Sequence, residues 1–88
     1  MKLENVRVGQ IVVDKHGNEY EVCEVGRGIM PIALRCFKFV KRVNVQADDV
    51  GFKHIDQKMW IYRSKKIAQN DGCDDMNILT VKSLKLKR

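Results

Sequence analysis

The beginning of the chain alternates hydrophobic and polar positions in a way that predicts an antiparallel hairpin. Residues 6–13 alternate and end in the β-branched run Ile11–Val13, which favours an extended strand. Gly17 can adopt the positive φ of a tight reversal, so residues 14–18 are expected to form the turn. Residues 19–25 then return as the second arm of the hairpin.

The next hydrophobic run changes parity part-way along. One parity carries Ile32, Leu34 and Cys36, and the other carries Phe37, Phe39, Val43 and Val45. Because strand side chains have a period of two, this switch predicts a bulge or a sharp bend near residues 36–37. Either a single strand changes faces there, as in a small barrel that turns a corner, or two strands meet through a short turn near residues 41–42.

The second half of the chain predicts another buried strand. Residues 59–62 are hydrophobic on both faces, and their aromatic and β-branched content favours a strand. A helix is the alternative, because four hydrophobic residues lie near helical spacing, namely Ile55, Met59, Tyr62 and Ile67.

Turns and a last strand are predicted in the remaining segments. Residues 48–51 and 69–72 are rich in Asp, Asn and Gly, a composition typical of turns. The last strand is expected to begin at residues 78–81, after which Leu84 and Leu86 alternate with lysines. Such lysines would face water on an edge strand, where their charge discourages pairing between molecules.

These elements predict one mainly β domain that spans residues 1–88. The hydrophobic fraction of 44% is enough for one core, and 88 residues are too few for two. Five or six short strands with little helix indicate either a small barrel or a strongly bent antiparallel sheet.

The opening hairpin also resembles a known family. Residues 6–14 and 17–22 are similar to the first hairpin of SH3-like small barrels, including KOW-type and Tudor-like modules. Gly9, Gln10 and Gly17 match that pattern, although an acidic residue is usual where Gln10 stands and the later paired glycines are absent. The resemblance implies an SH3-like barrel. It implies no particular binding residue, because such barrels bind RNA, DNA, peptides and proteins.

The charge of the chain is positive and unevenly distributed. The formal net charge is +6, which favours polyanionic partners through long-range attraction. Residues 26–47, 58–70 and 81–88 carry basic side chains and no acidic ones, and acidic loops separate these blocks. The blocks predict a binding face if they converge. Otherwise they are a solvated surface that the acidic loops offset.

The three cysteines indicate a reducing compartment. Their number is odd and their spacing irregular, so they cannot form a complete disulfide framework. No hydrophobic run approaches 18 residues, and no leader-like segment begins the sequence. A cytoplasmic protein without a membrane span is therefore expected.

The residues typical of catalysis and of metal binding are absent or scattered. Residues 26–28 have neither the spacing nor the lysine of a phosphate-binding loop, and no Gly-x-Ser-x-Gly motif occurs. A metal site would need closely spaced ligands, whereas the candidate ligands stand far apart at His16, Cys23, Cys36, His54 and Cys73. The sequence therefore predicts no enzyme activity, no metal and no cofactor.

Aromatic and basic side chains alternate in residues 35–39 and 60–63. Exposed aromatic rings can stack on unpaired bases while Lys and Arg neutralise phosphates. Phe37 and Phe39 are expected to lie in the core instead. Trp60 and Tyr62 are expected to point outward, because strand parity places Met59 and Ile61 inside.

Two hypotheses for function follow. The first is a non-catalytic nucleic-acid-binding module for RNA or DNA, which uses a basic face with exposed aromatics. Its contact residues would be Arg35, Lys38, Lys41, Arg42, Trp60, Tyr62, Arg63, Lys65 and Lys66. The alternative is a protein-interaction module, such as an adaptor or an inhibitor, that docks on an acidic partner surface. The sequence makes no prediction about the oligomeric state.

Overall fold

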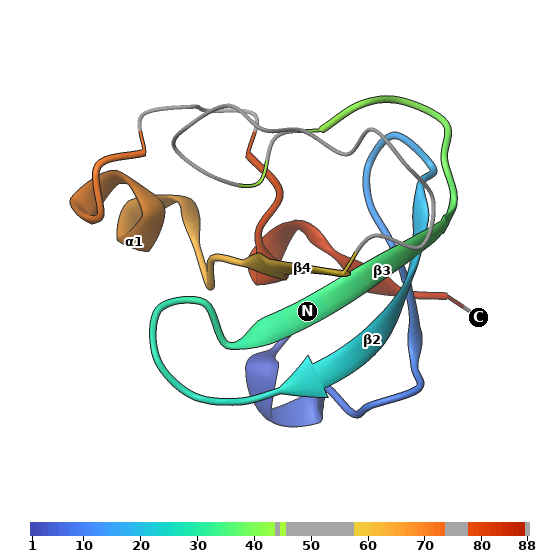
Figure 1. Cartoon of the computed structure of the whole chain (residues 1–88), viewed down its shortest axis with the longest axis horizontal. Coiled ribbons are helices and arrows are strands. Elements are labelled where there is room, and N and C mark those ends of the chain that lie inside the picture. Colours follow the sequence, from blue (N-terminus) through green and yellow to red (C-terminus); the bar gives the residue numbers. More distant parts are fainter. Residues whose placement is uncertain (44, 46–57, 74–77, 88) are drawn as a thin grey trace.

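The computed structural model describes residues 1–43, 45, 58–73 and 78–87 (Figure 1). In these residues five strands form one sheet in the order β4-β3-β2-β1-β5, and every neighbouring pair is antiparallel. The strands are β1 (Ile11–Val13), β2 (Glu19–Val25), β3 (Ile32–Lys38), β4 (Lys58–Ile61) and β5 (Lys85–Leu86). The other described elements are a helix, α1 (Lys65–Asn70), and two 3-10 turns, η1 (Leu3–Asn5) and η2 (Val81–Ser83). The predicted mainly β fold is confirmed. Of the two predicted architectures, the described residues form the bent antiparallel sheet, which is open and has β4 and β5 at its edges.

The predicted hairpin is formed by β1 and β2. Asp14 closes its turn, because the carboxylate accepts hydrogen bonds from the backbone N–H groups of His16 at 2.9 Å and Asn18 at 3.0 Å. Gly17 has the expected positive φ, of 90°. The turn is therefore determined by local chemistry that the sequence already shows.

The predicted bulge near residues 36–37 is also confirmed. Tyr20 pairs with Cys36, and the preceding residue, Glu19, pairs with Lys38, so Phe37 is the extra residue of β3. An extra residue exchanges the two faces of a strand and bends the sheet. The bulge at Phe37 lies inside β3, which ends at Lys38. The parity switch therefore arises within a single strand that turns a corner.

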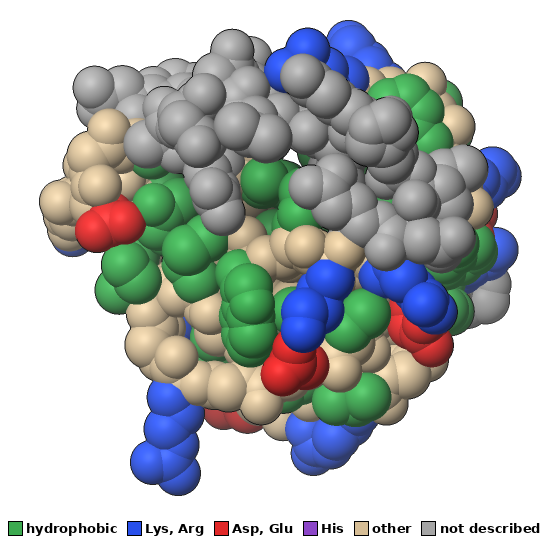
Figure 2. Space-filling model, in the orientation of Figure 1, with side chains coloured by type: hydrophobic (Ala, Val, Ile, Leu, Met, Phe, Trp, Pro, Cys, Tyr) green, Lys and Arg blue, Asp and Glu red, His purple; other side chains and the backbone are tan. Residues whose placement is uncertain are grey.

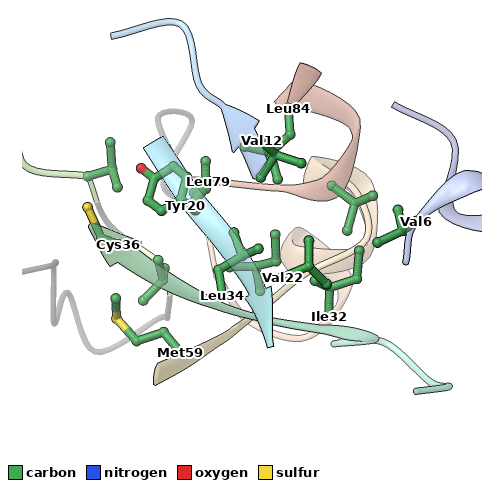
Figure 3. Close-up of a cluster of buried hydrophobic side chains, with 14 residues drawn as sticks. Val6, Val12, Tyr20, Val22, Ile32, Leu34, Cys36, Met59, Leu79 and Leu84 are labelled. Carbon is green, nitrogen blue, oxygen red and sulfur yellow. The ribbon is translucent and has the colours of Figure 1, made fainter. Parts of the chain in front are cut away.

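The main core lies on one face of the sheet, where side chains of β1 to β4 meet those of the C-terminal segment (Figure 3). Tyr20, Leu34 and Leu84 are fully buried there. The bend after β3 brings Val43 and Val45 back into this same cluster. Burial of this apolar surface is the main force that holds the bent sheet together.

A second, smaller cluster lies around α1. It contains Tyr62, Ala68, Cys73 and Ile78. The helix begins where the Ser64 side chain accepts the backbone N–H of Ile67 at 3.3 Å. This helix was not predicted from the sequence, because six residues are too few to produce a clear helical period. No helix in the described ranges is long and hydrophobic enough to cross a membrane.

Some predicted boundaries were correct and others were wrong. A strand forms at residues 58–61, one residue earlier than the predicted 59–62. The turn predicted at residues 69–72 is limited to Asp71–Gly72, because Gln69 and Asn70 belong to α1. The first strand begins at Ile11 and not at residue 6, because residues 8–9 form a turn in which Gly9 has a positive φ, of 91°. The turn predicted at residues 48–51 lies outside the described residues.

The last strand is confirmed as an edge strand but is shorter than predicted. Residues 78–81 do not begin it: Thr80 instead forms a parallel bridge with Tyr62, and η2 follows. Leu84 is buried as expected, whereas Leu86 is 43% exposed. The alternation fails at Leu86 because η2 displaces Leu84 from β5, so that the two leucines do not share one strand.

Candidate nucleic-acid interface

A buried polar network lies under the end of the β1–β2 hairpin. The Tyr20 hydroxyl donates to Asp14 Oδ2 at 2.6 Å, and Asn18 Nδ2 donates to the same oxygen at 2.8 Å. Burial, together with the Asp14 carboxylate, raises the pKa of Tyr20 far above its ordinary value. The phenol therefore remains a hydrogen-bond donor at all physiological pH values.

Asn18 connects this network to the segment that follows β3. Its Oδ1 accepts the backbone N–H groups of Val40 at 2.5 Å and Lys41 at 2.9 Å. Its Nδ2 donates to the carbonyl oxygen of Lys41 at 2.7 Å. Three hydrogen bonds from one buried side chain thus hold a surface segment in a defined position.

The segment held by Asn18 exposes hydrophobic and basic side chains together. Phe37, Phe39 and Val40 are 41%, 42% and 54% exposed. Lys41 and Arg42 follow directly and are exposed as well. We call residues 37–42 the aromatic–basic strip.

The expectation that Phe37 and Phe39 lie in the core was wrong. The bulge at Phe37 turns its ring away from the face that carries Cys36. β3 then ends at Lys38, so no further strand pairing directs Phe39 inward. The exposure of these two rings is the strongest sign of a functional surface in the described residues, because large hydrophobic side chains gathered on a surface often mark a binding site.

Lys38 lies within the strip, and it shares the acidic partner Glu19 with Lys87. The buried Glu19 carboxylate lies 2.7 Å from Lys87 Nζ and 3.4 Å from Lys38 Nζ. The hydrogen bond from Lys87 is the main cause that lowers the pKa of Glu19. Two lysines around one carboxylate leave a net positive charge at this end of β3.

Two of the predicted contact residues, Arg35 and Trp60, lie elsewhere, on the outer face of β2, β3 and β4. Figure 2 shows basic and acidic side chains next to one another on the surface of the molecule. Arg35 pairs with Glu21 at 2.5 Å, and Lys58 pairs with Glu24. The Glu24 carboxylate raises the pKa of Lys58. Trp60 is partly exposed beside these pairs. We call these five residues the Trp60 face, and its charges balance.

Tyr62 was expected to be exposed, and this was wrong. It is 4% exposed, and its hydroxyl donates to Asp71 Oδ2 at 2.7 Å. Strand parity does direct Tyr62 away from the main core. The second cluster, with Ala68 of α1, covers that end of the sheet and buries the ring.

The remaining predicted contacts follow β4. The Arg63 guanidinium donates to the carbonyl oxygen of Gly28 at 3.1 Å, so it braces the β2–β3 loop. Lys65 and Lys66 lie in the first turn of α1 and are exposed. Only Lys65 of this pair lines a pocket that reaches the hairpin turn.

The lining of that pocket shows which basic residues lie close together in the fold. It has a volume of about 80 Å³ and is lined by Asp14, Lys15, His16, Val43, Lys65, Ile78, Leu79 and Ser83. Val43 directly follows the aromatic–basic strip, so the strip, the hairpin turn and the start of α1 meet around it. Within the part of the chain that the structure describes, Lys15, Lys41 and Lys65 form no ion pair.

The nine predicted contact residues therefore do not form a single patch. Lys38, Lys41, Arg42 and Lys65 lie around the end of the hairpin. Arg35 and Trp60 lie on the Trp60 face, while Tyr62 is buried, Arg63 braces a loop, and Lys66 lies outside the pocket lining. Lys15 was not identified from the sequence, because its place in a tight turn gave no reason to single it out.

Comparisons with known proteins do not assign the chain to a family. No family model matches it, and neither the curated proteins nor the solved structures contain a significant match. In the described ranges, no three His, Cys, Asp or Glu side chains are grouped so that they could hold a metal ion.

Proposed function

We propose that this protein is a non-catalytic nucleic-acid-binding module that contacts RNA or DNA through the aromatic–basic strip. The observation that carries the proposal is the pair of exposed phenylalanines, which flank Lys38 and precede Lys41 and Arg42. Aromatic faces stack on unpaired bases with little sequence preference, and neighbouring cations neutralise the phosphates. Because Asn18 already holds the backbone of residues 40–41, little conformational freedom is lost on binding.

The distribution of charge supports the same surface. The basic residues of the Trp60 face have acidic partners, whereas Lys15, Lys41 and Lys65 have none among the described residues. A polyanion would thus be attracted to the hairpin end more than to the sheet face.

The fold and location are further parts of the proposal. A meander from β1 to β4, in which β1 also pairs with the last strand, supports an SH3-like arrangement. The three cysteines are odd in number and irregularly spaced, which supports a cytoplasmic location.

The test is binding of fluorescently labelled 12-nucleotide probes, measured by anisotropy from 50 to 300 mM salt. Single-stranded RNA and DNA should bind, and about four phosphate contacts would give a log–log salt slope of about −3. No binding to either probe at 50 mM salt, or a flat salt response, would overturn the proposal.

Matched variants locate the surface. Lys41→Glu should weaken binding more than Lys58→Glu, which changes the net charge equally but lies on the Trp60 face. Phe39→Ala should reduce affinity roughly 5-fold or more, as expected for one lost stacking contact. Leu86→Ala is its control, since Leu86 is 43% exposed and Phe39 is 42% exposed. Equal losses within each pair would mean that the strip is not the contact surface.

A protein-interaction module is the second candidate, and the Trp60 face favours it. A partly exposed tryptophan beside balanced ion pairs suits a protein surface better than a polyanion, because tryptophan is frequent among the residues that dominate protein interfaces. If this candidate is correct, the nucleic-acid probes should not bind, and Trp60→Ala should abolish association with the partner while Lys41→Glu slows it.

A further inference from the structure

A groove lies beside β5, at one edge of the sheet. It has a volume of about 560 Å³ and is lined by Met1, Lys2, Asn5, Leu84, Lys85 and Leu86. The first three belong to the N-terminal segment and the last three to the C-terminal segment, so the groove lies between η1 and β5. Its volume falls within the range of roughly 300–1,000 Å³ that is usual for binding sites.

The outer side of β5 carries backbone groups that no described strand pairs. The N–H of Lys87 donates to the carbonyl oxygen of Ile11 at 3.0 Å, and the register places Leu86 opposite Val12. Hydrogen-bonded and non-hydrogen-bonded pairs alternate along an antiparallel ladder, so the N–H and C=O of Leu86 point away from β1. They are therefore placed to pair with a further strand.

The same edge already accepts a hydrogen bond from the N-terminal segment. Leu84 precedes Leu86 by two residues and is extended, so its carbonyl oxygen points to the same side of the chain. The terminal amino group of Met1 donates to that oxygen at 3.1 Å. The groove thus continues from Met1 along the outer side of β5.

Leu86 is an exposed hydrophobic side chain at the margin of the main core. It lies opposite Val12, and opposite residues of a ladder project from the same face of the sheet. Val12 is fully buried, whereas Leu86 is 43% exposed. One hydrophobic side chain from an added strand would therefore extend the core over Leu86.

The charges around the groove favour an acidic ligand. Lys2 and Lys85 line it and are exposed, whereas Glu4 of η1 does not line it. Neither lysine forms an ion pair with any residue that the structure describes. Carboxylates of a ligand would thus be attracted to this edge.

We infer that the edge of β5 binds an extended peptide segment of a partner protein, in which hydrophobic and acidic residues alternate. The segment pairs with the backbone of Leu86 as a strand added to the sheet. Its residue opposite Leu86 is hydrophobic, and the residues beside it project to the face of Lys85 and are acidic. This inference goes beyond nucleic-acid binding, because no residue of the aromatic–basic strip lines the groove.

Two other occupants suit the groove less well. A second copy that paired through its own β5 would bring the lysines at positions 85 and 87 of both chains together, and like charges on neighbouring strands are destabilising. A nucleic-acid strand would find no aromatic ring in the lining on which to stack a base.

The first experiment measures binding of a labelled peptide of alternating valine and glutamate, about eight residues long, by anisotropy. Saturable binding is expected, and a peptide with lysine in place of glutamate should bind at least about 10-fold more weakly. A peptide methylated at every backbone nitrogen cannot donate to the edge and should bind at least about 10-fold more weakly as well. No binding of the glutamate peptide up to about 1 mM, or equal binding of the methylated peptide, would overturn the inference.

The second experiment changes the backbone of the edge. Leu86→Pro removes an N–H that does not pair with β1, so the sheet should remain intact while affinity for the glutamate peptide falls at least about 10-fold. Leu86→Ala keeps that N–H and should cost only about 2- to 5-fold. Equal losses would overturn strand pairing. Thermal unfolding shows whether Leu86→Pro is folded; if it is not, the methylated peptide decides.

The third experiment compares Lys85→Glu with Lys58→Glu. Both change the net charge equally, but Lys58 lies on β4, at the opposite edge of the sheet. Lys85→Glu should weaken binding of the glutamate peptide at least about 5-fold more. Equal effects would mean that only long-range charge matters, and the groove would not be the binding site.

The outcomes separate this inference from the proposed function. If the wild-type protein binds the glutamate peptide but neither nucleic-acid probe, the proposed function fails and the peptide site stands. If Leu86→Pro weakens the nucleic-acid probes as much as the peptide, the groove belongs to a nucleic-acid surface and the peptide inference is wrong. Dimers of the wild-type protein in sedimentation that Leu86→Pro abolishes would identify a second copy as the occupant, and would overturn it too.

Discussion

Asn18 provides the sharpest test of how the surface strip is held. Its side chain makes four hydrogen bonds, one to Asp14 and three to the backbone of Val40 and Lys41, and it is 1% exposed. A hydrogen bond of this kind contributes roughly 0.5–1.5 kcal/mol net, so four of them set a range of about 2–6 kcal/mol. The three bonds to residues 40–41 are only partly buried, and water can replace some of them. We therefore expect Asn18→Ala to lower the free energy of unfolding by about 2–4 kcal/mol.

That loss is large for this protein. A domain of 88 residues has a free energy of unfolding of roughly 4–13 kcal/mol. Urea unfolding, followed by the fluorescence of the single tryptophan, Trp60, measures the change. Asn5→Ala is the matched control, because Asn5 is exposed and only its backbone oxygen accepts a hydrogen bond, from Gln10. A loss below about 1 kcal/mol for Asn18→Ala, or a loss equal to that of Asn5→Ala, would refute the reasoning.

The same variant tests whether rigidity contributes to binding. At a temperature where Asn18→Ala remains folded, the strip should be less ordered, and affinity for the single-stranded 12-nucleotide probes should fall because more conformational freedom is lost on binding. Unchanged affinity in a destabilised variant would show that Asn18 supports the fold without organising the binding surface.

Two further predictions concern the sheet. Lys87 lowers the pKa of Glu19 below the ordinary value of 4.5, so the ion pairs of Glu19 should stabilise the fold above about pH 4.5 and lose that effect as the pH falls through the lowered pKa. The difference in urea midpoint between wild type and Glu19→Gln should therefore become smaller as the pH is lowered from 7 to 3. A difference that stays constant would contradict a stabilising role of these ion pairs. Leu84→Ala should lower the free energy of unfolding by about 2–5 kcal/mol, since Leu84 is fully buried. Leu86→Ala should change it by less than about 0.5 kcal/mol, and similar losses for both would show that the last strand is packed differently.

The features predicted correctly from sequence are those with a local cause. The hairpin turn needs only Asp14 and a glycine at position 17, which lie within the turn itself. The bulge follows from the parity of side chains between Cys36 and Phe37, because a strand cannot change faces otherwise. Each of these predictions needed only the residues of one short segment.

The candidate site was predicted less well, because exposure depends on what packs against a residue. Tyr62 follows strand parity as expected, yet the second cluster covers it. Phe37 and Phe39 were assigned to the core for their hydrophobicity, and they are exposed because the strand bulges and then ends. Arg35 is basic in the sequence, but its register places it opposite Glu21, which offsets its charge.

By itself, the sequence determines the mainly β composition, the hairpin, the bulge and the overall positive charge, because each follows from residues that are neighbours in the chain. Only the tertiary structure decides which basic residues meet. Lys15, Lys41 and Lys65 come from three separate segments, and they gather at the hairpin end because Asn18 fixes residues 40–41 there and the pocket joins α1 to the turn. The physical reason is that pairing and burial between distant segments determine exposure and net local charge, and neither can be read from spacing along the chain.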